Sequence, residues 1–287
     1  MNQKGGVGKT TTTVNLGAGL AELGHSTLIV DLDPQAHATL HLGVDPDGLE
    51  SSVYDALLDP EASALDAVLE LRPKLALLPA EVNLAAAETE LASAPDRQRR
   101  LESALEPLLD LFDFVLIDCP PSLGLLTLNA LAAAQEVVVP MQSHFLALQG
   151  VGKLLETVRL VSRGVNESLL VSGVILCMHD ENTNHAREVV ADLEAFFEEA
   201  KTQNVPWRHA KVYRPAVRRN IKLAECPSFG QTIFDYAAWC PGALDYRALA
   251  ASIAAERIEK SVEPLKETAP TPEVTIRNTS APSTSAR

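Results

Sequence analysis

The chain has 287 residues, of which 46% are hydrophobic and 22% charged, as is typical of a folded globular protein. Acidic residues outnumber basic residues by 38 to 24, and the net charge of −14 excludes a uniformly basic nucleic-acid coat. Four cysteines without a CxxC pair argue against a zinc ribbon and favour a reducing compartment: Cys119, Cys177, Cys226 and Cys240. No apolar run reaches about 18 residues and the first residues are polar, so we expect a cytoplasmic protein without a membrane span or signal peptide.

Short apolar segments alternate with longer segments of helical spacing along most of the chain. A helix is predicted at 10–23, followed by a buried strand at 26–31. Further strands are predicted at 74–79, 112–118, 136–140 and 169–177, and further helices at 81–94, 97–111, 146–161, 183–200 and 244–259. This alternation predicts an α/β fold in which a mostly parallel, twisted sheet carries helices on both faces.

The composition changes near the C-terminus. We expect residues 1–260 to form one domain. Residues 261–287 are rich in Pro, Ser and Thr, and they are predicted to form a disordered tail because they cannot bury enough apolar area to offset ordering.

A glycine-rich loop opens the chain and runs directly into the first predicted helix. Glycines allow backbone N–H groups to converge on phosphate oxygens, and the helix N-terminus adds partial positive charge. Lys9 is expected to neutralise the β- and γ-phosphates, and the Thr10 hydroxyl is expected to coordinate Mg²⁺. The predicted nucleotide contacts in this loop are Lys4, Gly5, Gly6, Val7, Gly8, Lys9, Thr10 and Thr11.

Aspartates follow two of the predicted strands. Asp31 is the last residue of the strand at 26–31 and Asp33 follows two positions later, while Asp118 ends the strand at 112–118. Carboxylates at the C-terminal ends of parallel strands face the crevice where ligands bind. Asp118 is predicted to hold Mg²⁺ through a water, since Mg²⁺ keeps much of its hydration shell. The neighbouring Cys119 is expected to be a small buried residue and not a nucleophile.

These three motifs resemble those of one family. KGGVGKTT resembles the deviant Walker A motif of the ParA/Soj/MinD ATPases, which nitrogenase iron proteins share, while DLDPQ and DCPPS resemble the Walker A′ and Walker B motifs of the ParA branch. The resemblance implies a P-loop NTPase that uses ATP and Mg²⁺. It also implies catalytic roles for three residues: Lys4 reaches the partner's phosphates in a nucleotide-sandwich homodimer, Lys9 binds the phosphates, and Asp33 activates the attacking water. Asp31 would support the Mg²⁺ region.

The resemblance extends over nearly all of residues 2–260. The segment from Pro140 to Val151 resembles a switch-like segment of the family that begins P-x-Q. Residues 217–230 are similar to PRNVRLAEAPSxG, which lies over the adenine in relatives, so Arg218 and Asn220 are implied base-edge contacts. Arg218 replaces a proline of that pattern.

Three departures from the family pattern affect these expectations. Relatives have an apolar strand before the loop, whereas only three residues precede Lys4 here, so we expect a missing or truncated first strand with sequence upstream; a gap in the sheet is the alternative. An arginine that contacts DNA in relatives is Asn182 here. Residues 198–209 resemble an insertion.

A local basic run lies between residues 208 and 222, which contain six basic and no acidic side chains. Lys222 occupies a place where relatives have a DNA-contacting arginine, and Arg214 and Arg219 are further candidates for phosphate contacts. Alternatively, these side chains serve nucleotide binding and solubility.

Taken with the resemblance, the sequence predicts a partition or positioning ATPase. ATP would drive dimerisation and non-specific DNA binding at the nucleoid, and slow hydrolysis to ADP and phosphate, stimulated by a ParB-like protein, would reset it. The cargo could be a chromosome, a plasmid or a protein assembly. The first alternative is a nucleotide-switched positioning or regulatory factor that does not bind DNA. The tail disfavours a membrane-associated MinD-like regulator, and the context of the cysteines does not match that of a nitrogenase-iron-protein-like reductase.

Overall fold

The computed structural model describes residues 5–143 and 145–262. The expected first strand, Lys4 and nearly all of the predicted tail therefore lie outside the described residues. Predictions about them stay predictions.

The described strands form two sheets. β1 (Thr27–Asp31), β2 (Leu69–Arg72), β3 (Leu75–Leu78) and β4 (Phe114–Asp118) pair in the order β2-β3-β1-β4. β5 (Glu136–Met141), β6 (Leu170–Leu176) and β7 (Lys211–Val212) pair in the order β5-β6-β7. Every pair is parallel except β2 with β3, so the prediction of a mostly parallel sheet is confirmed.

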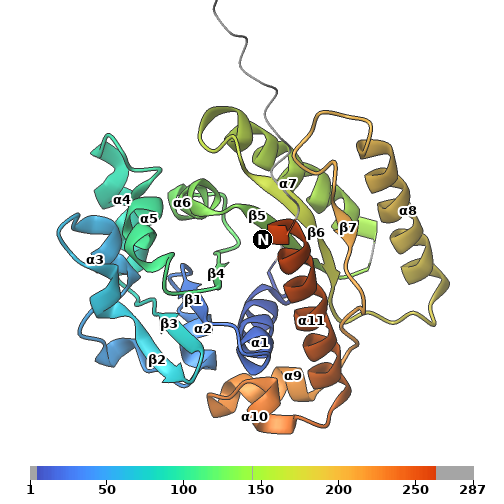
Figure 1. The fold of residues 1–287 in the computed structure, drawn as a ribbon, viewed down its shortest axis with the longest axis horizontal. Helices are drawn as coiled ribbons and strands as arrows, with labels where there is room; N and C mark the ends of the chain where they lie inside the picture. The colour runs from blue at the N-terminus through green and yellow to red at the C-terminus, as the bar shows by residue number, and fades with distance from the viewer. Residues whose placement is uncertain (1–4, 144, 263–287) are drawn as a thin grey trace, which may run out of the picture.

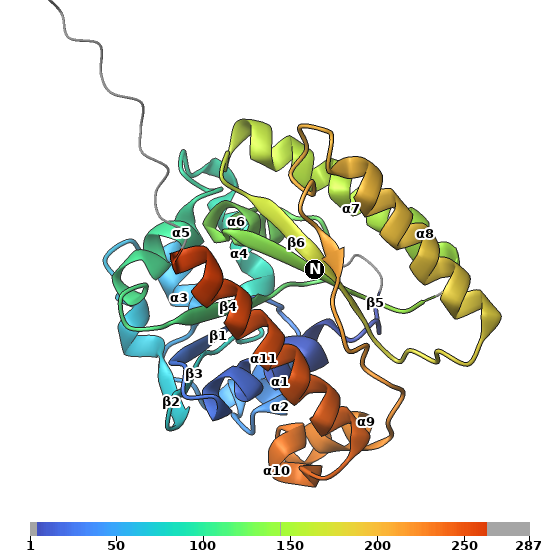
Figure 2. The ribbon, with the colours of Figure 1, turned by 45° about the vertical axis from the view of Figure 1, so that its right-hand side comes forward.

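Helices cover both faces of the first sheet. Successive side chains of β1 point to opposite faces and all five are buried, so both faces must be covered. Leu28 and Val30 pack into a core with α3 (Val53–Leu58), α4 (Leu84–Glu90), α5 (Arg100–Leu105) and α6 (Leu125–Ala133). Ile29, between them in sequence, packs on the other face with α1 (Lys9–Glu22) and α11 (Pro241–Val262). These two helices lie side by side (Figures 1 and 2). None of the helices within 5–262 is long and apolar enough to cross a membrane.

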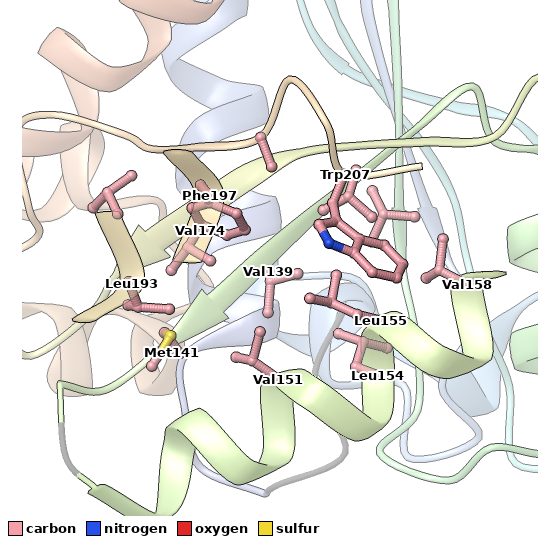
Figure 3. Packing of buried hydrophobic residues seen from close by; sticks show 14 of the residues in the cluster. Val139, Met141, Val151, Leu154, Leu155, Val158, Val174, Leu193, Phe197 and Trp207 are labelled. Carbon is pink, nitrogen blue, oxygen red and sulfur yellow. The ribbon is translucent and has the colours of Figure 1, made fainter. Parts of the chain in front are cut away.

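The second sheet has its own core (Figure 3). Val139 and Met141 of β5 and Leu176 of β6 pack against α7 (Phe145–Gly164) and α8 (Asn184–Ala200). Trp207, from the segment predicted to be an insertion, is only 9% exposed and completes this core. An aromatic side chain therefore anchors this segment, and its assignment as an insertion stays a prediction.

Some element boundaries differ from the prediction for local reasons. The helix expected at 97–111 ends at Leu105 and continues as a 3-10 turn, Glu106–Leu108, because Pro107 cannot donate a backbone hydrogen bond. The expected helix at 81–94 is likewise shorter, with α4 followed by the turn Leu91–Ser93. α3 was not predicted from the sequence, although Ser52 and Asp55 form a capping box at its start.

Three further short helices of the described residues pack against α1 or against one another. These are α2 (His37–His41), α9 (Lys222–Glu225) and α10 (Ile233–Ala237), with the 3-10 turn Cys226–Phe229 after α9. Where α2 ends, Gly43 touches Gly230, which follows the turn: a Cβ on Gly230 would lie 2.7 Å from the Gly43 Cα.

We expect Gly230→Ala to destabilise the protein by about 3 kcal/mol, because alanine would be strained at a φ of +62° and would also overlap Gly43. Chemical denaturation measures this. Gly24→Ala is the control, since Gly24 also has a positive φ, +94°, but its Cβ would meet nothing within 4 Å; it should cost about 1 kcal/mol. Equal losses in the two variants would contradict the close contact.

Candidate functional site

The glycine-rich loop leads into α1 with the backbone geometry that its sequence predicts. Gly6 and Gly8 have φ values of +70° and +94°, which L-residues with side chains rarely adopt. The first turn of α1 consists of Lys9 and three threonines. Unpaired N–H groups and the helix dipole make such an N-terminus suitable for an anion. The loop can therefore hold phosphate groups.

Asp118 lies beside the first turns of α1. Thr13 Oγ1 donates to its Oδ1 at 3.3 Å, and its side chain is buried. Burial raises the pKa of Asp118, while the Thr10 hydroxyl and the Lys9 charge lower it. Its other oxygen, Oδ2, is buried and has no hydrogen-bond partner among the described residues.

A buried carboxylate oxygen without a partner needs a ligand to satisfy it. Mg²⁺ or one of its water ligands would do so, and the Thr10 hydroxyl is close enough to act with it. The residues present therefore fit a magnesium site formed by Thr10 and Asp118.

Asp31 is opposite Asp118 in the β1–β4 register and is fully buried. Burial raises the pKa of Asp31 to about 7, with a further contribution from the Asp118 carboxylate, and hydrogen bonds from Thr39 oppose the shift. Its Oδ2 accepts from the backbone N–H and the hydroxyl of Thr39, both at 2.8 Å, and its Oδ1 accepts from the Asp33 N–H at 3.1 Å. Both oxygens thus order the turn after β1; the predicted support of Mg²⁺ stays a prediction.

Asp33 lies in that turn and is 7% exposed. Its Oδ1 accepts from the Gln35 N–H at 3.0 Å, and its charge contributes to raising the pKa of Asp118. The structure therefore brings Asp33 to the same end of the sheet as the loop and Asp118. Its catalytic role stays a prediction.

Of the two residues after β5, Gln142 contacts the glycine-rich loop and Ser143 contacts His179; none of the three was singled out from the sequence. Gln142 Nε2 donates to the Gly6 carbonyl at 3.1 Å. Ser143 Oγ lies 2.9 Å from His179 Nδ1. The P-x-Q pattern was the signal for Gln142, but nothing in the sequence pointed to His179.

A buried polar contact also joins α1 to α11. Thr12 Oγ1 lies 3.0 Å from the Tyr246 hydroxyl and 3.5 Å from Cys177 Sγ. Burial raises the pKa of Cys177 to about 11 and that of Cys119 to about 12. Both thiols are therefore protonated at neutral pH, which agrees with Cys119 as a small buried residue.

The two predicted base contacts are held differently. Arg218 donates from Nε and Nη2 to the carboxylate of Asp245, the shortest distance being 2.7 Å. Asn220 Oδ1 accepts from the Lys222 N–H at 2.9 Å at the start of α9, which leaves its NH₂ group to contact a base edge. The contact of either residue with adenine stays a prediction.

The basic run from 208 to 222 is largely paired with carboxylates. Four of its six cations form salt bridges: Lys211 with Glu256, Arg214 with Glu194, Arg218 with Asp245 and Lys222 with Glu225. Lys222 also lies 5.5 Å from the centroid of the Tyr236 ring. The run is a weaker positive patch than its sequence alone indicates.

A glycine-rich loop at the N-terminus of α1, with carboxylates at the ends of the adjacent parallel strands β1 and β4, defines a P-loop nucleotide-binding protein. Residues 1–171 match the model of the AAA domain family. The chain is 44% identical over 255 residues to the sporulation initiation inhibitor protein Soj of Bacillus subtilis, which covers 88% of this chain and 96% of that protein. It is 46% identical over 255 residues to the chromosome-partitioning ATPase Soj of Thermus thermophilus, with 88% and 93% covered.

Solved structures agree with these relatives. The cobyrinic acid a,c-diamide synthase of Mycobacterium smegmatis, with a bound ATP analogue and magnesium, has a TM-score of 0.75 and 37% identity and covers 91% of this chain and 94% of that one. MinD of Pyrococcus horikoshii, complexed with Mg-ADP, shares the fold with a TM-score of 0.67, 24% identity and coverage of 91% and 96%. The chain belongs to the AAA domain family and, within it, to the Soj/ParA chromosome-partitioning ATPases.

Proposed function

We propose that this protein is an ATP-dependent, dimerising partition or positioning ATPase that binds DNA without sequence preference in its ATP state and is reset by partner-stimulated hydrolysis. The observation that carries the ATPase part is the unsatisfied, buried Oδ2 of Asp118 beside the Thr10 hydroxyl and the phosphate loop. The identity to partitioning ATPases supports the cellular role.

Each part of the loop has a distinct task in nucleotide binding. Backbone N–H groups of residues 5–11 and the dipole of α1 hold the phosphates, and the Lys9 ammonium neutralises their charge. Thr10 and Asp118 would hold Mg²⁺, which supplies neutralisation of the developing charge on the β- and γ-oxygens when bound. The hydroxyl of the half-buried Thr13 fixes the orientation of the Asp118 carboxylate.

Hydrolysis requires a positioned water as well as bound phosphates. Asp33 supplies the carboxylate that orients it, and the hydrogen bond from the Gln35 N–H to Asp33 Oδ1 keeps that side chain in place. The other oxygen of the carboxylate is then the acceptor for the water proton. Phosphoryl transfer in such sites works by positioning and charge.

Dimerisation and reset complete the proposed cycle. Lys4 would reach the phosphates of a second subunit, adding a cation to the developing charge. A ParB-like protein would stimulate turnover. We place the protein in the cytoplasm at the nucleoid, with residues 1–260 as the ATPase domain and 261–287 as a disordered tail.

DNA binding depends on the exposed cations between 208 and 222. Partly exposed ion pairs such as Lys222 with Glu225 contribute little to stability, so DNA phosphates can replace their carboxylates. Dimerisation would place two copies of this surface together, and ATP should therefore tighten binding.

We expect Lys222→Glu to weaken binding evenly across duplex sequences, to flatten the dependence of log K on log salt by about two for a dimer, and to leave ATP affinity unchanged. Electrophoretic mobility shift over a salt series measures this. Lys201→Glu is the matched control, because Lys201 is also paired with a carboxylate three residues away, Glu198, but lies at the end of α8. Asn182→Arg should strengthen binding. A joint loss of ATP and DNA binding in Lys222→Glu would assign the basic run to the nucleotide pocket.

A nucleotide-switched positioning factor that does not bind DNA is the second candidate. The four salt bridges within the basic run favour it, because they reduce the positive charge available to phosphates. An ATP-bound dimer that does not retard duplex DNA at low salt would select this candidate. A reductase with a cluster shared between subunits is disfavoured, since all four cysteines are buried within the chain.

A further inference from the structure

Side chains from two distant parts of the chain hold the two ends of the phosphate loop. On one side, Gln142 Nε2 donates to the carbonyl of Gly6 at 3.1 Å. On the other, the hydroxyl of Tyr246 lies 3.0 Å from Thr12 Oγ1 in the first turn of α1. The Gln142 contact is with the carbonyl of Gly6 and not with the N–H that would face a phosphate, and Thr12 is not among the predicted nucleotide contacts.

These two holding points are connected to each other. The hydroxyl of Ser143, next to Gln142, is hydrogen-bonded to Nδ1 of His179 at 2.9 Å. The His179 N–H donates to the Val217 carbonyl at 3.0 Å, and His179 forms a parallel bridge with Arg218. Arg218 then bonds Asp245, the residue before Tyr246. These contacts connect Gly6 to Thr12 through residues 142–143, 179, 217–218 and 245–246. Together with the backbone from Gly6 to Thr12 they form a closed ring of residues.

The Arg218–Asp245 salt bridge is the contact in this ring that depends on charge. The Asp245 side chain is 5% exposed and accepts from the backbone N–H of Arg218 at 3.0 Å as well as from its guanidinium. The Arg218 side chain is 53% exposed, so water can hydrogen-bond its guanidinium if the pair breaks. Water cannot reach the buried Asp245 carboxylate in the same way. Loss of the guanidinium leaves a buried carboxylate short of partners, and the start of α11 must shift to hydrate it.

We propose that Arg218 and Asp245 are positioning residues that hold the phosphate loop through Tyr246 and Thr12, and that the Arg218 guanidinium serves this pair and not the base. This inference rests on the proposed function, in which the loop binds the phosphates of ATP. It assigns a role to Asp245, and it leaves Asn220 as the side chain of this segment that would contact adenine.

The test compares a nucleotide with a ligand that has no base. We expect Arg218→Gln to weaken Mg-ATP binding about tenfold, the effect of losing one charge-assisted contact. Because the ring positions the phosphate loop, the affinity for Mg-tripolyphosphate should fall by the same factor. Displacement of a fluorescent ATP analogue measures both affinities. Arg218→Lys keeps the charge but not the bidentate fork, so it should lose only about threefold for both ligands.

The control is Arg72→Gln, which breaks an ion pair outside the ring, in which Arg72 Nη1 donates to both carboxylate oxygens of Asp235, at 2.7 and 2.8 Å. It should lower the melting temperature and leave both affinities unchanged, since global stability does not alter the affinity of protein that is fully folded at the assay temperature.

Three outcomes would overturn the positioning pair. One is wild-type affinity in Arg218→Gln for both ligands. Another is a loss for ATP with unchanged tripolyphosphate affinity, which would make Arg218 a base contact. The third is an equal affinity loss in Arg72→Gln. If Arg218→Gln does not fold, Arg218→Lys decides in the same way. Absence of ATP binding by the unaltered protein is a separate result, which contradicts the proposed function itself.

Discussion

Asp33→Ala is expected to leave ATP binding intact and to reduce phosphate release by about 10²- to 10⁴-fold, the range for a group that acts on the attacking water. Asp33 is buried in the turn after β1, and one oxygen is fixed by the Gln35 N–H. Its loss removes the group that orients water but none of the loop that holds the phosphates.

The variant should therefore accumulate as an ATP-bound dimer, detectable as a doubled molar mass by light scattering. Asp47→Ala, which removes an exposed aspartate of the same stretch, should keep normal turnover. Undiminished phosphate release in Asp33→Ala would transfer the catalytic role to another residue.

Lys9→Ala should lower ATP affinity by at least about 100-fold, to below detection by calorimetry. Lys9 is the first residue of α1, and its charge acts on Asp118, so its ammonium lies within the site formed by the loop and the carboxylates. Without it, the triphosphate faces Asp118 and Asp33 with no compensating side-chain cation from the start of the helix.

Lys153→Ala is the matched control for Lys9→Ala, because it removes one exposed lysine from α7 and should bind ATP normally. Both variants should melt close to the unaltered protein without nucleotide. ATP should raise the melting temperature of Lys153→Ala and not that of Lys9→Ala. Normal ATP affinity in Lys9→Ala would contradict the assignment of the phosphate loop.

Local patterns were sufficient to predict the parts of the site that lie within one element. The strand at 26–31, the strand at 112–118 and the helix after the glycines are all present, and their ends place Asp31 and Asp118 opposite each other. This follows because parallel strands end at the same edge of a sheet. Two helices were predicted too long: α4 ends at Glu90 and α5 at Leu105, because the apolar spacing continues through residues that form 3-10 turns.

The contacts that support the loop could not be predicted, because they join residues that are far apart in sequence. Thr12 and Tyr246 are separated by 234 positions, and Gly6 and Gln142 by 136. The basic run shows the same limit in another way. Its charges are visible in the sequence, but Glu194, Asp245 and Glu256, which pair with three of them, lie on α8 and α11 and are brought there only by folding.

Binding of duplex DNA by the purified protein with ATP, with ADP and without nucleotide, across a salt series, tests the nucleotide-switched partition function most directly. We predict retardation of DNA of any sequence by the ATP form, a steep loss of affinity with rising salt, and little retardation in the other two states. Equal retardation in all three states would contradict control by the nucleotide, and no retardation by the ATP form at low salt would contradict DNA binding itself.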